Sequence, residues 1–259
     1  MSNPEGSPIW YELMTDDPDA AQNFYGPIMG WTFGRMEGGL EIDYRIATND
    51  GTGVCGVMRT PEHASGMPTM WFLYVGVDDV DASADKVVSL GGRVDIAPTD
   101  IPGVGRFAFV SDPQGAPFYL MRGNSDEDSQ AFESNTPGHF SWNELVTTDQ
   151  HAALEFYGKL FGWTKAGAMP MGDAGEYAFI NCHDRMIGAV MTAPDATTRP
   201  YWNFALEVLD IDDAKSAVEA GGGTVRAGPM ELPNDSGWLI QTNDPQGAKM
   251  MFSGPRRQG

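Results

Sequence analysis

The sequence predicts an α+β protein that contains two copies of one domain. Residues 9–34 read IWYELMTDDPDAAQNFYGPIMGWTFG, and residues 141–166 read SWNELVTTDQHAALEFYGKLFGWTKA. The later part of the chain repeats as well, because residues 71–94 are similar to residues 202–225 and the tetrapeptide DPQG occurs twice. A repeat of this length predicts that both copies build the same supersecondary units and the same binding face.

The opening segment of each copy predicts a strand followed by a helix. Large apolar and polar residues alternate over residues 8–15 and again over residues 140–147, which is the period of a β-strand. Asp17 and Asp149 are favourable N-cap residues, and each precedes a segment whose apolar side chains recur at three- and four-residue spacing. A glycine ends each of these predicted helices.

The remaining segments complete two βαβββ modules in each copy. The strands that complete the two opening modules are predicted at residues 31–35, 44–48 and 53–59, and at residues 163–165, 176–181 and 186–192. The second module of each copy is predicted to run from Trp71 through a helix at residues 81–90 to Arg122, and from Trp202 through a helix at residues 212–220 to Ser253. We therefore expect one domain at residues 1–122, an acidic linker at residues 123–137 and a second domain at residues 138–259.

The composition predicts a globular, acidic protein. Hydrophobic residues make up 41% of the chain, which is enough for two cores, and the formal net charge of -20 argues against nucleic acid or an anionic membrane as a partner. No apolar run approaches the roughly 20 residues that cross a bilayer, and the N-terminus lacks the pattern of a secretory leader, so we expect a soluble cytoplasmic protein. Cys55 and Cys182 occupy non-equivalent places in the repeat, which favours small buried residues over a disulfide or a thiolate metal cluster.

Two short motifs connect this layout with a known family. The pair FY is followed by GW after the first helix of each copy, and DPxG precedes the last strand. Together with four βαβββ modules, these motifs resemble the vicinal oxygen chelate superfamily, which includes glyoxalase I, the bleomycin-resistance proteins and the extradiol dioxygenases. The layout is similar to that of two-domain, glyoxalase-like proteins of actinobacteria. The resemblance implies that the modules form cupped mixed sheets, and it identifies the fold more specifically than the activity.

The resemblance also implies six positions for metal ligands. Metal-using relatives place one ligand in the opening strand of a module, seven residues before the aspartate that precedes the helix, and another four residues after the glycine of DPxG. In this chain these positions hold Trp10, Phe72, Tyr119, Trp142, Asn203 and Met251. Indole, phenyl and thioether groups do not supply the imidazole, carboxylate or thiolate donors of a Zn, Fe or Ni site. We therefore expect neither a metal nor another cofactor, and we expect structural or surface roles for the four histidines, His63, His139, His151 and His183.

The strand alternation predicts a different kind of site. Trp10 and Glu12 lie on one face of the first strand, and Trp142 and Glu144 lie on the equivalent face in the second copy. A tryptophan beside a carboxylate offers a stacking surface and a directional acceptor, which suits a planar ligand that carries a donor or a cation. Further candidates for ligand contact are Phe72, Tyr74, Tyr119 and Met121 in the first copy, and Asn203, Met251 and Ser253 in the second.

Three functions follow from this pattern. The first is a metal-free protein of the glyoxalase and bleomycin-resistance type that binds a planar or hydrophobic metabolite or antibiotic. The second is an enzyme of lyase, isomerase or dioxygenase-like type, in which Glu12 or Glu144 acts as general base or as a non-standard metal ligand. The third is an assembly surface. The expected partner is a small-molecule ligand, and the chain is expected to be a monomer or a homodimer.

Overall fold

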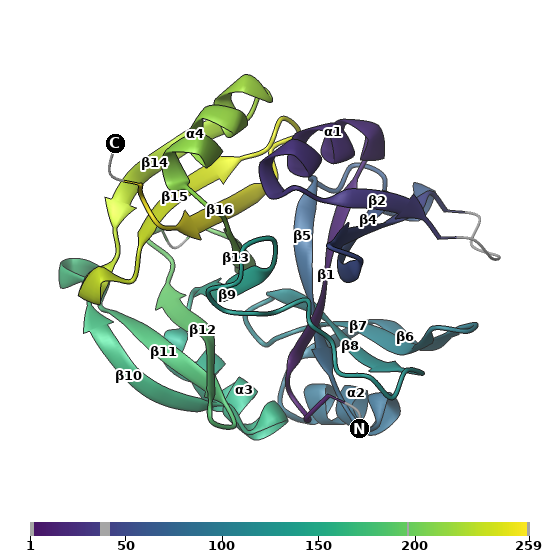
Figure 1. Cartoon of the computed structure of the whole chain (residues 1–259). Coiled ribbons are helices and arrows are strands. Elements are labelled where there is room, and N and C mark those ends of the chain that lie inside the picture. Colours follow the sequence, from purple (N-terminus) through teal and green to yellow (C-terminus); the bar gives the residue numbers. More distant parts are fainter. Residues whose placement is uncertain (1–2, 37–41, 196, 258–259) are drawn as a thin grey trace. The chain divides into compact units, whose positions relative to one another are not determined.

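Four modules of the same element order follow one another along the chain (Figure 1). The structure is a computed structural model that describes residues 3–36, 42–195 and 197–257. Each module has the order β-α-β-β-β, which confirms the predicted α+β fold of four βαβββ modules. Within the described ranges, no helix combines the length and the apolar character that crossing a membrane requires.

The element bounds show the repeat directly. The first module contains β1 (Pro8–Thr15), α1 (Pro18–Met29), β2 (Thr32–Arg35), β3 (Tyr44–Asn49) and β4 (Thr52–Arg59). The second contains β5 (Met70–Gly76), α2 (Val80–Ser89), β6 (Arg93–Ile101), β7 (Gly105–Ser111) and β8 (Pro117–Gly123). The third contains β9 (Phe140–Thr147), α3 (Gln150–Phe161), β10 (Thr164–Pro170), β11 (Glu176–Cys182) and β12 (Arg185–Thr192). The fourth contains β13 (Tyr201–Glu207), α4 (Ile211–Ala220), β14 (Thr224–Glu231), β15 (Trp238–Asn243) and β16 (Lys249–Gly254).

The predicted helix caps are present. The Asp17 carboxylate accepts the Ala20 N–H at 3.0 Å, and Asp149 caps α3 in the same way. The glycine that follows each of these two helices has a left-handed backbone, which a residue without Cβ adopts most easily. Most predicted strands of the opening modules agree with the structure to within a residue at each end, but β10 continues past Lys165 to Pro170, because its backbone pairs with β11 beyond a bulge.

The four strands of each module lie side by side in a mixed sheet. In every module the first strand pairs in parallel with the last, and the other pairs are antiparallel. The order is β2-β3-β4-β1 in the first module and β10-β11-β12-β9 in the third, and it is β5-β8-β7-β6 and β13-β16-β15-β14 in the other two. The third strand of an opening module is therefore separated from the first strand by one intervening strand.

The chain forms two compact units, and each unit combines a module from the first half of the sequence with a module from the second half. Unit 1 contains the described residues of 1–9, 72–129 and 142–203. Unit 2 contains those of 10–71, 130–141 and 204–259. In unit 1, α2 packs on β6, β7 and β8, and in unit 2, α4 packs on β14, β15 and β16 (Figure 1).

The repeated motifs join the two sequence halves within each unit. In unit 2, Tyr25 of the first FY pair donates to Asp244 of the second DPQG at 3.1 Å. In unit 1, Tyr157 of the second FY pair donates to Asp112 of the first DPQG at 3.2 Å. Burial raises the pKa of both aspartates. The FY and DPxG motifs are therefore packing motifs whose partners lie in opposite halves of the sequence.

The predicted linker contributes to a core. Phe132 is only 2% exposed and forms a β-bridge with Phe140 in unit 2. Phe140 in turn stacks on Tyr11, with ring centroids 3.7 Å apart. This part of the linker is held by burial of an aromatic side chain, although its composition resembles that of a flexible connection.

Candidate functional site

A chain of hydrogen bonds in the third module connects a tryptophan, a tyrosine and a glutamate. Trp142 Nε1 donates to the Tyr177 hydroxyl at 2.8 Å, and that hydroxyl donates to Glu144 Oε2 at 2.9 Å. Asn203 Nδ2 lies 3.4 Å from the other carboxylate oxygen, Oε1. All four residues belong to unit 1. We call Trp142, Tyr177 and Glu144 the second triad.

The first module contains the same arrangement, and here all members belong to unit 2. Trp10 Nε1 donates to the Tyr44 hydroxyl at 3.0 Å, and Tyr44 is hydrogen-bonded to Glu12. We call Trp10, Tyr44 and Glu12 the first triad. The sequence predicted the Trp/Glu pairs but not the tyrosines that connect their members. An available signal was the repeated order of an acidic residue followed by tyrosine at the start of β3 and β11.

The direction of each hydrogen-bond chain is fixed by chemistry. An indole N–H can only donate, so the tyrosine oxygen accepts from tryptophan and its proton is left for the glutamate. Burial raises the pKa of Tyr44 and of Tyr177, and the nearby charge of Glu12 or Glu144 raises it further. Both tyrosines therefore remain protonated donors at neutral pH and hold one side of each carboxylate.

The local sequence makes this arrangement possible. Residues two apart on a strand share a face, so Trp10 and Glu12 project on the same side of β1. Tyr44 must reach across β4 to meet them, and Gly56 stands opposite Glu12 on that intervening strand. A Cβ atom at Gly56 would lie 2.1 Å from the Tyr44 hydroxyl oxygen, so the missing side chain provides the space that the tyrosine occupies. The Trp10 ring likewise lies over Gly53.

In each triad the aromatic rings are more exposed to solvent than the carboxylate. Glu12 is 2% exposed and Glu144 is 8% exposed, whereas the tryptophans and tyrosines are half-buried. The exposed part of each triad is therefore aromatic surface, and the carboxylate acceptor is buried. The arrangement can stack a flat group, accept hydrogen bonds from it and, if the carboxylate takes a proton, act as a base.

Comparison with known proteins places this chain in a family. The profile of the Glyoxalase/Bleomycin resistance protein/Dioxygenase superfamily matches residues 8–120 and 136–252. The chain belongs to this superfamily. It is 34% identical over 247 residues to CFP32 of Mycobacterium tuberculosis, across 94% of this chain and 93% of that protein. It is 32% identical over 256 residues to the anthracycline biosynthesis protein DnrV of Streptomyces peucetius, across 94% of this chain and 91% of that protein.

Solved structures share this fold at low sequence identity. The Mn(II)-bound glyoxalase of Novosphingobium aromaticivorans superposes with a TM-score of 0.65 at 19% identity, covering 98% of this chain and 83% of that one. The 2,3-dioxygenase LapB of Pseudomonas sp. KL28 gives a TM-score of 0.68 at 13% identity, covering 99% and 94%. These likenesses support the fold and leave the activity to be argued from the site.

The residues at the superfamily's metal-binding positions do not fit a metal ion. No group of three or more His, Cys, Asp or Glu side chains converges anywhere in the part of the chain that the structure describes. Asn203 at one of these positions instead bonds Glu144 through its amide nitrogen, and Trp10 and Trp142 donate through their indoles. A divalent transition metal needs several imidazole, carboxylate or thiolate donors, and the residues at these positions do not supply them.

The other predicted aromatic residues gather on the sheet of the second module. Tyr74 and Tyr119 stack with centroids 4.1 Å apart, and Phe72 meets Tyr119 edge-on at 5.9 Å. All three are buried in unit 1. Of the second-copy candidates, Asn203 joins Glu144, whereas Met251 is buried on β16 in unit 2.

Some minor candidates have structural partners. Ser253 bonds Ser141 at 3.0 Å and the Glu207 carboxylate at 2.7 Å. Cys55 and Cys182 are both free and buried, as expected. His139 is also buried, and its Nδ1 lies 2.6 Å from the Gln130 carbonyl oxygen, which is consistent with a structural role.

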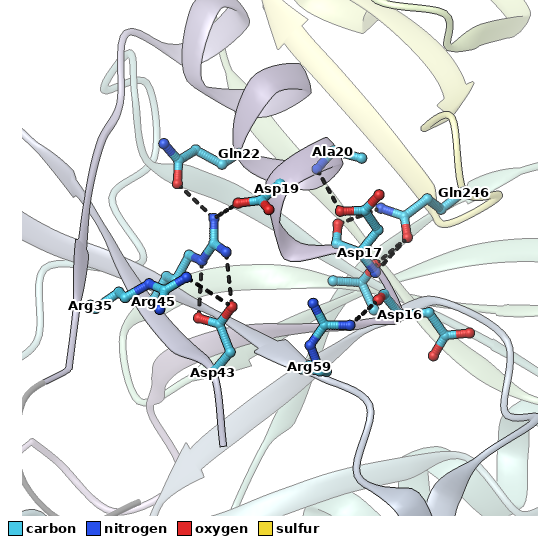
Figure 2. Close-up of polar contacts among 11 residues, drawn as sticks. Asp16, Asp17, Asp19, Ala20, Gln22, Arg35, Asp43, Arg45, Arg59 and Gln246 are labelled. Carbon is cyan, nitrogen blue, oxygen red and sulfur yellow. Dashed lines mark hydrogen bonds and ion pairs between the residues drawn. The ribbon is translucent and has the colours of Figure 1, made fainter. Parts of the chain in front are cut away.

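A buried arginine next to Tyr44 was not predicted from the sequence. Arg45 is 4% exposed and holds Asp43 through two nitrogens, with Nη2 at 2.8 Å and Nε at 3.1 Å (Figure 2). Its Nη1 bonds Asp19 at 2.7 Å and Gln22 at 3.0 Å, both on α1. Hydrogen bonding to Arg45 lowers the pKa of Asp43. The cluster attaches the strand that carries Tyr44 to the first helix, and so positions the first triad.

Figure 2 also shows how the second DPQG meets the start of α1. Gln246 Nε2 donates to the Asp17 carbonyl oxygen at 3.1 Å, and the Asp17 N–H bonds back to Gln246 Oε1 at 3.2 Å. The Thr15 hydroxyl also donates to the Gln246 side chain. Because β1 ends at Thr15, these bonds fix the end of the strand that presents Trp10 and Glu12.

Proposed function

We propose that this chain is a small-molecule-binding protein of the glyoxalase and bleomycin-resistance type, which binds a planar or hydrophobic metabolite or antibiotic without a metal ion. The observation that carries the proposal is the repetition of the Trp–Tyr–Glu triad in both halves. Packing alone does not require an indole N–H, a phenol and a carboxylate to be joined in the same order twice. A buried carboxylate is costly, which favours a use for it beyond filling space.

The exposure of the triads supports a ligand with a flat face. Half-buried tryptophan and tyrosine rings offer a stacking surface at low conformational cost, and the glutamate behind them selects for a hydrogen-bond donor. Relatives named for anthracycline biosynthesis support the same class, since anthracyclines are flat polycyclic molecules. We further propose that the chain is a monomer or homodimer and binds neither nucleic acid nor membranes, as its charge of -20 suggests.

Fluorescence titration tests this proposal. Flat polycyclic probes should quench tryptophan emission in a saturable manner, and Trp10→Ala and Trp142→Ala should each remove part of the signal. Trp238→Ala is the matched control, because Trp238 is partly exposed and stacks with Arg256 outside both triads. The proposal is wrong if the Trp10→Ala/Trp142→Ala double variant binds the probes as the wild type does.

The second candidate is an enzyme in which Glu12 or Glu144 is a general base. The observation that favours it is the position of each carboxylate, which is buried beside half-buried aromatic rings. Exchange of acidic C–H protons of candidate ligands into heavy water, followed by NMR, would detect such a base. The enzyme hypothesis requires Glu12→Gln or Glu144→Gln to slow the exchange. Equal exchange rates in the wild type and both variants would refute it and leave ligand binding as the remaining function.

A further inference from the structure

Asn203 distinguishes the second triad from the first. It is the repeat counterpart of Phe72, so the first half has no amide at this position. Asn203 is 3% exposed, and its Nδ2 faces Glu144 Oε1 at 3.4 Å. A carboxylate only accepts hydrogen bonds, so the amide nitrogen must be the end that faces it. The orientation of the amide is thereby fixed, and its carbonyl oxygen is left as a second acceptor beside the Glu144 carboxylate.

That carbonyl oxygen can accept a hydrogen bond that the described residues do not supply. Asn203 Oδ1 is buried and has no hydrogen-bond partner among the described residues. A buried acceptor without a partner destabilises the folded state, so an unsatisfied atom beside a buried carboxylate calls for an explanation. A bound ligand that donates a hydrogen to Asn203 Oδ1 would supply one.

We infer that the second triad binds a small organic ammonium ion, with Asn203 Oδ1 and the Glu144 carboxylate as acceptors for its N–H groups. This inference rests on the proposed ligand-binding function and names the class of ligand for one of the two sites. A group that meets two acceptors at once must carry at least two hydrogens, which a hydroxyl does not. An ammonium group has them, and its positive charge complements the carboxylate. The half-buried Trp142 ring offers a further favourable surface for a cation.

The inference assigns Asn203 as a specificity-determining residue. In the first half, Phe72 provides no acceptor, and the sheet of its module is lined by aromatic rings such as Tyr74 and Tyr119. We therefore expect the two halves to differ in ligand preference, with ammonium recognition confined to the second triad.

Calorimetric titration with benzylammonium and benzyl alcohol tests the inference. The two probes share a ring and differ in the donor group. The wild type should bind benzylammonium about tenfold more tightly or better, because a hydrogen bond to a charged group is worth more than a neutral one. Asn203→Leu keeps the Glu144 carboxylate but removes the second acceptor, so it should lose part of this preference, whereas Phe72→Leu should keep all of it. Equal binding of both probes by the wild type, or an unchanged preference in Asn203→Leu, would overturn the inference.

The same experiment separates the inference from the proposed function. If both probes bind equally and Trp142→Ala abolishes both signals, the triad is a ligand site and the ammonium inference alone is wrong. If neither probe depends on Trp142, the proposed site and the inference are both wrong. The comparison of the two probes on the wild type remains decisive even if Asn203→Leu does not fold.

Discussion

Replacing Tyr177 with phenylalanine should destabilise the protein by about 2 kcal/mol. The change removes the hydroxyl that accepts from Trp142 at 2.8 Å and donates to Glu144 at 2.9 Å. A neutral hydrogen bond contributes about 1 kcal/mol and one to a charged group about 1.5–3 kcal/mol. We expect a loss somewhat below their sum, because the Tyr177 ring is half-buried and water can replace part of the lost hydrogen bonding.

Urea unfolding followed by circular dichroism measures this effect. With a typical slope of about 1–3 kcal/mol per molar, a loss of 2 kcal/mol moves the midpoint by about 1 M. Tyr44→Phe should behave similarly, because the first triad has the same connections.

A double-mutant cycle identifies the source of the effect. In a Glu144→Gln background the charged acceptor is absent, so Tyr177→Phe should cost about 1 kcal/mol less than in the wild type. The hydrogen-bond chain would be refuted if Tyr177→Phe shifted stability by less than about 0.5 kcal/mol. An equal cost in both backgrounds would show that the hydroxyl does not serve the carboxylate.

Three further predictions concern packing, pH and metal content. In thermal melts, Gly105→Ala should destabilise the protein by about 2 kcal/mol or more, since its Cβ would lie 2.2 Å from the Arg122 carbonyl oxygen. Gly34→Ala is the control and should be nearly neutral, because a Cβ at Gly34 would have no atom within 4 Å. Burial raises the pKa of Asp112 and Asp244, so these carboxyl groups bind protons more tightly in the folded state than in the unfolded chain. As pH falls through the raised pKa values towards the unfolded value of about 4, protonation of these groups therefore favours folding progressively more. The Asp112→Asn/Asp244→Asn variant should therefore gain less stability than the wild type between pH 8 and about pH 4 in urea titrations, and an identical gain would contradict this reasoning. Elemental analysis of the purified protein should find far less than one equivalent of Zn, Fe, Ni or Mn, and a stoichiometric metal would disprove the metal-free part of the proposed function.

Local chemistry made much of the fold predictable. Asp17 and Asp149 as N-caps, the glycines that end the first helix of each copy and the period-2 strands all act over a few residues, so they can be read in sequence. Because the sequence is repeated, each element predicted in one half of the chain could also be predicted in the other half. The Trp/Glu pairs could be predicted for the same reason, because residues two apart on a strand always share a face.

The contacts that complete the site depend on pairing between distant segments. Tyr44 and Tyr177 join their triads only because the third strand of the module lies one strand away from the first, and alternation does not reveal strand order. The buried position of Arg45 likewise depends on how α1 packs near β3. The orientation of Asn203 was decided by Glu144, which lies 59 residues away in sequence.

The sequence by itself determined four βαβββ modules, their caps and turns, and a Trp/Glu pair in each half. Only the tertiary structure decided that tyrosines connect those pairs, and that the FY and DPxG motifs meet across the two halves within each compact unit. The physical reason is the range of the interactions. Backbone geometry and capping are settled by near neighbours in sequence, whereas hydrogen bonds between side chains depend on which distant surfaces are buried together.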